Sequence, residues 1–594
     1  MTIGIRTLLQ VLFADDMTIF LEYDKNSLMK TLKVLQEFYN ISGLKIQIDK
    51  TQATIIGVEH FQPPWAGEFD IVWKDNFKLL GINFDNLLKD MERNVDNKIN
   101  SMTETMRKWE YKILTPIGRL NVAKTFITSK LSHVGFTIPI TQKHIKDIEQ
   151  KVCGFIMNDT PYCDRKDSKA NIEKGGMNMI DIESQMKAFS VSWMKRLYMN
   201  YNSNKEWIYL FKEQLRKIEL KKNEKLNPAH FWTLGTKTLT KISKSIKSDF
   251  WKKVISNTID YIKIIETTSI EMLINEHLWD SHIFYENNNS PPVRNYNSLS
   301  KRITKLSDII IMENNICPKW MTLMQATRRY GNIHREQFDR LINKGKDILK
   351  KYKMHLRDIK GIFPMMPALV QVATTQMTGC NKWGKQFKMK YNTRDKLKVN
   401  QSKIESKHNE ELNLRLTAND FQKIYRNRKT LNFDNKLSFF QFLINRNNMY
   451  TNQKLSTFKH WISPLCTFCN GQEENIEHLF WSCPIVSAFL TQCIQFLYRN
   501  YDDFHSLNVK FNKENFIFGI RQESYTTINN VVLMLMKKFI WNKRCTEELP
   551  TIPVFKSYLK TELKHYLNVN LTPKVDVRLK IMDSKSFQDF INNL

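Results

Sequence analysis

The sequence predicts a mainly α-helical protein with a small α/β segment at its N-terminus. Glycine and proline are scarce, with 18 and 16 among 594 residues, and this favours long helices over loops or disorder. Hydrophobic residues make up 42% of the chain, which is enough for packed cores. Short apolar runs rich in strand-forming residues occur near the start, whereas later segments carry apolar residues at steps of three and four.

Two short apolar runs, 8–13 and 17–21, flank an acidic pair, Asp15 and Asp16. The runs predict two strands joined by a tight turn that carries both carboxylates. Oxygen ligands suit Mg²⁺, and a metal would offset the repulsion between the two charges. An ordinary hairpin with a polar turn is the alternative, although the turn lacks the usual Asn-Gly or Asp-Gly pair.

Three further motifs follow the acidic pair in order. An amphipathic helix is predicted after Ser27, then comes Ser-Gly-Leu-Lys-Ile-Gln at 42–47 before Lys50-Thr51, and then Phe-Lys-Leu-Leu-Gly-Ile at 77–82. Together with the acidic hairpin, this order resembles the second half of the palm of reverse transcriptases of non-LTR (LINE-type) retrotransposons. Gln47 stands where the family has Asn, and Leu79 stands where an aromatic residue is common.

The resemblance implies a partial palm over residues 1–85. Asp15 would be a direct Mg²⁺ ligand with Asp16 as its support, Lys50 would protonate the pyrophosphate, and Gly81 would lie near nucleic acid. A surface lysine beside a strand is the alternative for Lys50. Only twelve residues precede Phe13, so we expect the family's earlier aspartate and its fingers to be missing, and a two-metal site to be incomplete.

Residues 86–200 resemble the family's thumb. Apolar residues from Leu88 to Ile113 form one helical stripe, and a Pro-Ile-Gly-Arg-Leu turn at 116–120 leads into a second helix. Arg119, Lys124 and Lys130 are candidate phosphate contacts, with solvated surface charges as the alternative. A Gly-Gly block at 174–182 follows, in which Asn178 replaces a glycine of the family and Asp181 is the predicted N-cap of the next helix.

Residues 201–290 are predicted to be a helical connector, with a linker at 287–292, and residues 291–455 a helical basic region. The most basic stretch of residues 291–455 interleaves cationic with aromatic residues. Such a stretch is suited to nucleic-acid binding, because cations contact phosphates and aromatic rings stack on unpaired bases. The candidates are Lys382, Trp383, Lys385 and Lys388. Because Trp383, Phe387 and Tyr391 fall at helical spacing, a packed core rimmed by lysines is the slightly favoured alternative.

Residues 456–490 contain the strongest metal signal, Cys466, Cys469, His478 and Cys483 in the pattern Cys-x2-Cys-x8-His-x4-Cys. Three thiolates and one imidazole predict a closed tetrahedral Zn²⁺ site, which has a structural and not a catalytic role. The surrounding sequence resembles the zinc-binding segment downstream of the polymerase in LINE-type proteins, which implies a role in holding element RNA or target DNA. Residues 491–594 are predicted to be helical.

The chain carries 90 Lys and Arg against 60 Asp and Glu, a formal net charge of +30, which favours a polyanionic partner. A membrane surface is the competing explanation, but no apolar run of about 18 residues is present. The nine scattered cysteines argue against a disulfide framework and for a reducing compartment, so we expect a nuclear or cytoplasmic location.

Two hypotheses for function follow. The first is a segment of a non-LTR reverse transcriptase that is inactive alone and whose partners are an RNA template, a DNA primer or target, and an intact polymerase supplied in trans. The second is a non-catalytic, zinc-containing RNA- or DNA-binding protein derived from a degenerate element. A group II intron maturase shares the acidic hairpin, but the cysteine spacing and the Gly-Gly block do not suit it.

Overall fold

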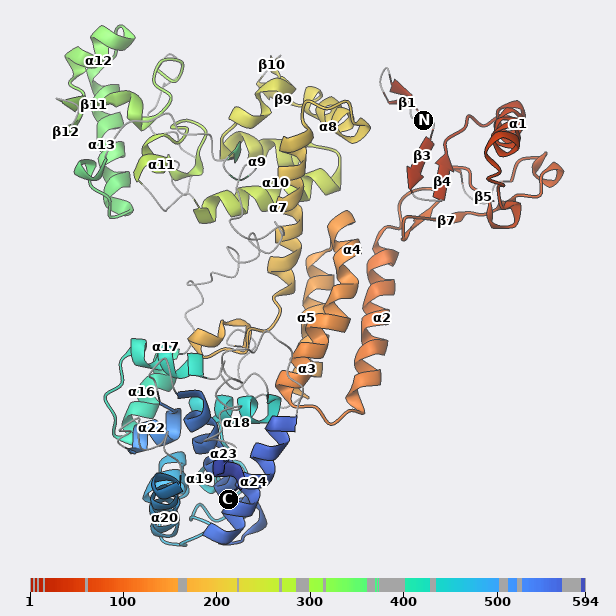
Figure 1. Cartoon of the computed structure of the whole chain (residues 1–594). Helices are drawn as coiled ribbons and strands as arrows, with labels where there is room; N and C mark the ends of the chain where they lie inside the picture. The colour runs from red at the N-terminus through yellow and green to blue at the C-terminus, as the bar shows by residue number, and fades with distance from the viewer. Residues whose placement is uncertain are drawn as a thin grey trace. The chain divides into compact units, whose positions relative to one another are not determined.

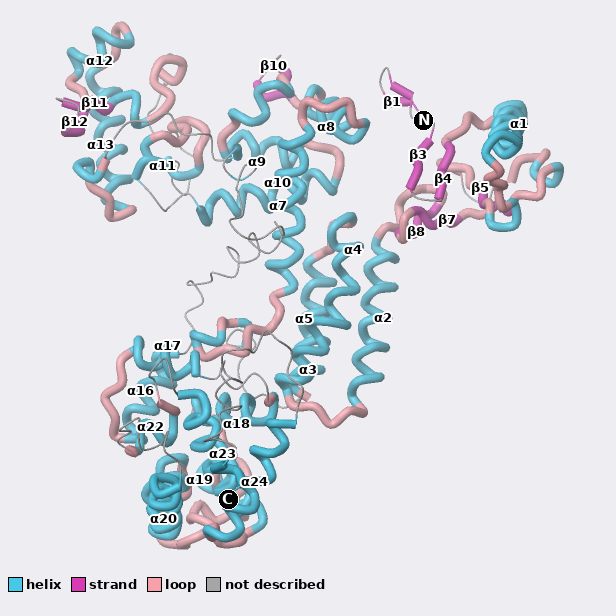
Figure 2. The backbone as a smooth tube through the Cα atoms, in the orientation of Figure 1, coloured by secondary structure: helices cyan, strands magenta, loops and turns pink. Residues whose placement is uncertain are grey.

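Helices make up most of the chain and strands occur only as short pairs, as the composition predicts (Figure 2). The computed structural model describes all residues except 1, 4–5, 8–9, 14–15, 59–61, 159–167, 222–223, 266–269, 285–298, 314–316, 360–368, 371, 373–400, 428–433, 501–510, 521–525, 569–588 and 593. The predicted linker at 287–292 therefore lies outside the described residues.

The chain forms two units, and neither is continuous in sequence. Unit 1 comprises Met1–Ser101, Lys130–Lys146 and Ile182–Thr393, and unit 2 comprises Met102–Ser129, Asp147–Asp181 and Arg394–Leu594. The predicted thumb-like region, 86–200, thus contributes residues to both units.

The predicted hairpin at the N-terminus of unit 1 is present. Strands β3 (Gln10–Phe13) and β4 (Asp16–Ile19) pair antiparallel with Phe13 opposite Asp16. The predicted helix follows as α1 (Lys25–Ser42), which Asp24 caps by accepting from the Ser27 amide at 3.0 Å. None of the α1 residues is buried, so its apolar stripe is only half covered within this structure. The other short elements of this region are β1 (Thr2–Ile3), β2 (Arg6–Thr7), η1 (Ile48–Lys50), β5 (Gln52–Ala53), η2 (Ala66–Glu68) and β6 (Val72–Trp73).

A second hairpin explains the Leu-Gly pair of the 77–82 motif. Strands β7 (Asn76–Leu79) and β8 (Ile82–Asp85) are joined by the two residues Leu80 and Gly81, whose φ angles are 47° and 82°. Two consecutive positive φ angles match the right-handed twist of a two-residue hairpin, and glycine adopts such an angle without strain.

The long helix predicted from the stripe at 88–113 is shorter at both ends. Helix α2 spans Glu92–Glu110 and buries the middle of the stripe, including Val95, Ile99, Met102 and Met106. Leu88 lies before the helix with a φ of 57°, and Ile113 lies beyond it and is fully exposed. Helix α3 (Pro116–Val122) starts with Thr115 as its cap and continues through η3 (Ala123–Ile127) and η4 (Thr128–Lys130).

The rest of unit 1 has two helical cores. One surrounds Phe211, Phe231 and Trp251, and the other surrounds Leu306, Phe338 and Leu341. The first contains α7 (Ile182–Asn200), α8 (Glu206–Arg216), η6 (Pro228–Thr233), α9 (Thr236–Ser245) and α10 (Asp249–Ile265). The second contains α11 (Ile270–Ile274), η8 (Leu306–Ile309), α12 (Leu323–Tyr330), α13 (Arg335–Lys351) and a hairpin of β11 (Ile310–Glu313) and β12 (Cys317–Trp320) that was not predicted. Helix α4 (Leu131–Thr137), the pair β9 (Glu219–Lys221) and β10 (Glu224–Lys225), η7 (His282–Phe284) and η9 (Leu356–Asp358) complete the unit.

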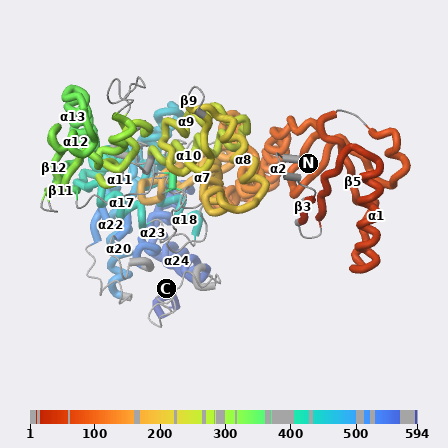
Figure 3. Tube along the Cα trace, turned by 90° about the horizontal axis from the view of Figure 1, so that it is seen from above, coloured from red at the N-terminus to blue at the C-terminus, as the bar shows by residue number. Residues whose placement is uncertain are grey.

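The C-terminal part of unit 2 is a group of helices, seen from two directions in Figure 1 and Figure 3. The buried side chains of this part form one hydrophobic core. Its elements are α16 (Gln401–Leu412), α17 (Ala418–Asn427), α18 (Asn435–Asn445), α19 (Asn452–Ser456), η11 (His478–Ser482), α20 (Pro484–Asn500), α22 (Lys513–Phe518), α23 (Thr526–Thr546) and α24 (Ile552–Asn568). The predicted zinc segment does not have a core of its own. Its Phe480 packs edge-to-face against Phe440 of α18 at 6.4 Å between centroids, and both belong to the shared core.

The Gly-Gly block also belongs to unit 2, after η5 (Ile172–Lys174) and the second half of α5 (Gln142–Met157). Gly175 has a φ of 73° and Asn178 a φ of 55°. Asparagine is among the few residues that tolerate this left-handed conformation, which explains why it can replace a glycine at 178. Asp181 directly precedes α7, where the sequence places an N-cap.

Candidate metal centre

The palm candidates are only partly described. Asp16 is the first residue of β4 and is exposed, and Lys50 is exposed at the end of η1, whereas Asp15 lies outside the described residues. A magnesium site at this hairpin therefore stays a prediction.

The candidate phosphate contacts of the thumb-like region have different surroundings. Lys124 is exposed on η3, but Lys130 is half-buried and its Nζ donates to the Ser101 carbonyl and hydroxyl at 3.1 and 2.9 Å. Arg119 departs from the expectation of a surface cation. Its side chain is buried, its Nη1 donates to the Phe155 carbonyl at 3.1 Å, and its guanidinium lies 5.4 Å from the Phe155 ring. We therefore assign Arg119 a packing role.

Gly81 is exposed in the β7–β8 turn, where His133 Nε2 lies 2.8 Å from the neighbouring Leu80 carbonyl. The four candidates of the basic stretch, Lys382, Trp383, Lys385 and Lys388, lie outside the described residues.

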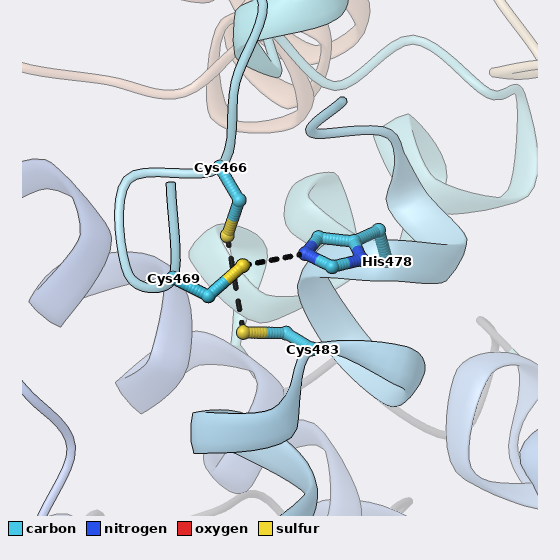
Figure 4. Close-up of side chains that lie close together, drawn as sticks. All are labelled: Cys466, Cys469, His478 and Cys483. Atoms are coloured by element: carbon cyan, nitrogen blue, oxygen red, sulfur yellow. Dashed lines mark hydrogen bonds between the residues drawn. The ribbon is translucent and has the colours of Figure 1, made fainter. Parts of the chain in front are cut away.

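The structure brings together the four predicted zinc ligands, Cys466, Cys469, His478 and Cys483, which we call the Cys/His cluster. One ligand atom from each lies within 4.8 Å of all the others. Figure 4 shows the three sulfur atoms and the imidazole converging from a loop, a helical turn and the start of a helix. Cys466 and Cys483 are fully buried and His478 is nearly so. Among the described residues, no other group of three or more His, Cys, Asp or Glu side chains is gathered in this way.

A tight loop presents the first two cysteines. The Cys466 amide donates to the Gln472 carbonyl at 2.8 Å, and the Asn470 amide returns to the Cys466 carbonyl at 2.9 Å. Asn470 takes a φ of 51°, which lets the chain reverse directly after Cys469. The Gly471 amide lies 3.5 Å from Cys469 Sγ. The loop therefore holds both sulfur atoms on one side.

A distorted helical turn presents the other two ligands. His478 starts the π-helical turn η11, and its amide donates to Asn475 Oδ1 at 2.7 Å. The turn closes when the Cys483 amide reaches the His478 carbonyl at 2.9 Å. Cys483 directly precedes α20, which begins with a proline, so its sulfur lies at a helix N-terminus, where negative charge is favoured.

The electrostatics favour a thiolate at Cys483. The Cys466 thiol donates to Cys483 Sγ at 3.9 Å, which lowers the pKa of Cys483, and the amides of Ile485 and Val486 lower it further. The same bond raises the pKa of Cys466, because it keeps the proton on that sulfur. Burial lowers the pKa of His478, so the imidazole is held neutral, as a metal ligand must be.

Two of the six ligand–ligand separations are close to those of a tetrahedral zinc ion. With Zn–S near 2.3 Å and Zn–N near 2.1 Å, a tetrahedron has S–S edges of about 3.8 Å and S–N edges of about 3.6 Å. Cys466 and Cys483 Sγ are 3.9 Å apart, and Cys469 Sγ and His478 Nε2 are 3.3 Å apart. The cluster can thus bind Zn²⁺ with all four positions filled by protein, which leaves none for a reacting water.

A buried carboxylate, which lies in the zinc segment's sequence pattern but has no role assigned from sequence, supports the loop. Glu474 is fully buried, and its Oε2 accepts from the amide and the hydroxyl of Thr467 at 3.0 and 2.8 Å. Its Oε1 accepts from the Asn452 amide at 2.9 Å and from Arg544 Nε at 3.0 Å. Thr467 lies between the first two cysteines, so Glu474 positions that loop. Its signal in the sequence is weak, because a single acidic residue in a polar stretch usually lies on the surface.

Comparison with known families relates this region to reverse transcriptases. Residues 414–489 match the model of a family described as zinc-binding in reverse transcriptase. The match includes all four cluster residues as well as α17, α18 and α19, of which α17 and α18 share the core of the cluster. The zinc site and the relation to reverse transcriptases, both predicted from sequence, are thereby supported. In the described part of the chain, no helix has both the length and the apolar character needed to span a membrane.

Proposed function

We propose that this chain is a reverse-transcriptase-related segment of a non-LTR retroelement whose C-terminal unit binds nucleic acid with the help of a structural zinc ion. The observation that carries the proposal is the Cys/His cluster, which has tetrahedral spacing and lies inside the segment that matches the zinc-binding region of reverse transcriptases.

In this proposal the zinc ion shapes a surface and takes no part in catalysis. It joins a loop that holds two cysteines to a helical turn that holds the other two ligands, so that binding free energy is converted into folding free energy. Mg²⁺ would act at Asp15 and Asp16 of the palm hairpin when the rest of a palm is present.

The partners follow from charge and from the relation to reverse transcriptases. A surplus of 30 positive charges favours a polyanion, and an RNA template with a DNA primer or target is the polyanion that such enzymes hold. Because the thiols of the cluster must stay reduced to bind metal, we expect a reducing compartment, nuclear or cytoplasmic.

A second candidate function is nucleic-acid binding without polymerase activity. The β3–β4 hairpin favours this candidate. Among the described residues its two strands pair only with each other, and Asp16 is exposed. A two-metal reaction needs carboxylates held rigidly, and an isolated pair of strands is only marginally stable.

One experiment on the zinc-loaded chain separates the candidates. We would measure fluorescence anisotropy with a labelled RNA over a range of salt concentrations, and primer extension on the same RNA with Mg²⁺ and nucleotides. We expect binding that weakens steeply with salt and no extension. Failure to bind RNA at low salt would overturn the proposal. If the unaltered chain extends the primer, and Asp15→Asn and Asp16→Asn abolish this extension, the second candidate is wrong and the chain is an active polymerase.

A further inference from the structure

A short segment beside the Cys/His cluster exposes aromatic side chains to solvent. Trp461 is 80% exposed and Phe458 is 51% exposed. Among the described tryptophans only Trp461 is exposed, whereas every other one is half-buried or buried. Large aromatic side chains left in water are uncommon without a partner, because burying one contributes much of the energy of a core or interface. We call residues 457–462 the aromatic turn.

Hydrogen bonds hold the aromatic turn in one conformation. The amides of Phe458 and Lys459 donate to the Leu455 carbonyl at 3.2 and 2.8 Å, and the Ile462 amide donates to the Lys459 carbonyl at 2.9 Å. Phe458 also packs edge-to-face on Tyr450 at 6.2 Å between centroids. The backbone therefore presents the two exposed rings at low entropic cost to a ligand.

Both ends of the segment are tied to the metal-binding loop. Before the turn, Asn452 donates its Nδ2 to the Leu465 carbonyl at 2.8 Å and its amide to Glu474 at 2.9 Å. After the turn, the Pro464 carbonyl accepts from the Glu474 amide at 2.8 Å. The metal-binding loop thus fixes the position of the aromatic turn through Glu474 and Asn452.

Cations accompany the exposed rings. Lys459 and His460 are exposed within the turn, and Lys454 Nζ lies 5.7 Å from the Tyr450 ring. One acidic side chain, Glu473, is exposed nearby, and its carboxylate accepts from Gln453 Nε2 at 2.7 Å. The combination of flat rings and positive charge suits a ligand that offers both π-faces and phosphates.

We propose that the aromatic turn binds unpaired nucleotides, with a base stacking on Trp461 and Phe458 and the adjoining phosphate contacted by Lys459. This inference rests on the proposed function and specifies which form of nucleic acid the zinc-bearing unit holds. Paired bases cannot reach the rings, because their faces are already stacked within a duplex. An apolar protein surface would satisfy the rings but not the lysine.

The test measures affinity for a labelled single-stranded RNA of about ten nucleotides and for a duplex of the same sequence. Trp461→Ala is expected to weaken single-strand binding by about 5- to 150-fold, the range for losing one stacked base. Trp461→Phe should keep affinity within about threefold, because a smaller ring still stacks. Lys459→Gln should reduce the slope of log K against log salt by about 0.7 for one lost phosphate contact. Duplex binding should not change in the Trp461 variants.

Ile113→Ala is the matched control, since Ile113 is a fully exposed apolar residue of the same unit. It should leave both affinities unchanged, and every variant should keep one zinc ion per chain. A 4-thiouridine oligonucleotide should crosslink to the peptide that contains Trp461.

The outcomes separate the two proposals. If the chain binds the single strand and Trp461→Ala binds it equally well, the aromatic turn is not the site and the proposed function stands. If the unaltered, zinc-loaded chain binds no nucleic acid, the proposed function fails with it. If Trp461→Ala loses binding to vesicles of anionic lipid but not to RNA, the turn is a membrane contact and the inference is overturned.

Discussion

The guanidinium of Arg544 and the carboxylate of Glu474 form a buried ion pair that joins α23 to the metal-binding loop. Arg544 Nη2 and Nε lie 2.9 and 3.0 Å from Glu474 Oε1, and the two side chains are 11% and 0% exposed. The guanidinium also lies 5.0 Å from the ring of Trp541. The two partners are 70 residues apart in sequence, so the pair links the loop to a helix that is outside the segment matched by the zinc-binding family.

Arg544→Met is expected to destabilise unit 2 by about 3–5 kcal/mol, because it leaves the Glu474 charge buried without its cationic partner. We also expect zinc affinity to fall by about 10- to 100-fold, since Glu474 orients the loop between two ligands. Chemical denaturation and a competitive chelator titration measure the two effects. Lys108→Met removes the exposed pair with Glu104 and should cost less than about 0.5 kcal/mol. Equal effects of the two substitutions would contradict the role of the buried pair.

Cys469→Ser should lower bound zinc from one ion per chain to near zero, because the hydroxyl is a poor zinc ligand and the loop cannot offer a substitute. Elemental analysis of the purified chain measures the occupancy. Cys545→Ser is the control, since Cys545 is exposed and lies outside the cluster, and it should retain full occupancy. Full zinc content in the Cys469 variant would show that the ligand assignment is wrong.

Lys537 should make the free energy of unfolding of unit 2 change with pH in the alkaline range. It is fully buried, its Nζ donates to Gln441 Oε1 and the Ile517 carbonyl at 2.9 and 2.7 Å, and burial lowers its pKa to about 7. Between about pH 7 and the ordinary lysine value of 10.5, the unfolded chain binds this proton and the folded chain does not. Stability should therefore rise with pH across that window, by at most about 1.4 kcal/mol per pH unit from this group.

Comparing the zinc-loaded chain with Lys537→Met isolates this contribution, because the cysteines titrate equally in both proteins. The methionine variant should show a flatter dependence on pH in urea unfolding between pH 7.5 and 9.5. A parallel pair of pH profiles would mean that Lys537 keeps its charge in the folded state.

Gly175 and Asn178 should respond differently to substitution although both have positive φ angles. Gly175→Ala adds the left-handed penalty of about 1–2 kcal/mol, and its Cβ would also lie 3.0 Å from the Tyr425 ring. Asn178→Gly should change stability by less than about 1 kcal/mol, because glycine adopts the same φ without strain. Thermal unfolding of the two variants checks the difference. A larger loss at Asn178 than at Gly175 would mean that the asparagine side chain matters more than its backbone angle.

The metal centre could be predicted almost completely from sequence, because ligand type and spacing are local properties. The Cys-x2-Cys loop and the one-turn spacing of His478 and Cys483 both lie within eighteen residues, and local geometry brings them together. The supporting role of Glu474 could not be predicted, since it depends on Arg544, which reaches the carboxylate only through tertiary packing.

The helices and hairpins were predicted where periodicity or turn chemistry was strong, and missed where it was weak. The apolar stripe locates α2 but not its ends, because Leu88 and Ile113 continue the spacing although both are exposed and lie outside the helix. The hairpin β11–β12 was missed because its second strand, Cys317–Trp320, contains a proline and a lysine and lacks alternation. The sequence favours Arg119 as an exposed phosphate contact, whereas its side chain is buried. A single arginine after a glycine carries no signal in the sequence that it will be buried.

The discontinuous make-up of unit 2 has a consequence for its synthesis on the ribosome. Gly175 accepts a hydrogen bond from Arg446 at 3.4 Å, and the two residues are 271 positions apart. At about 5–20 residues per second, the chain around Gly175 waits roughly 14–54 s for this partner to be made. During that time its apolar residues lack the helices that cover them later, so newly made chains of this protein are exposed to chaperones and to aggregation for a large part of their translation. Chains that are cut short before Arg446 would therefore lose unit 2 as a whole and not only its last helices.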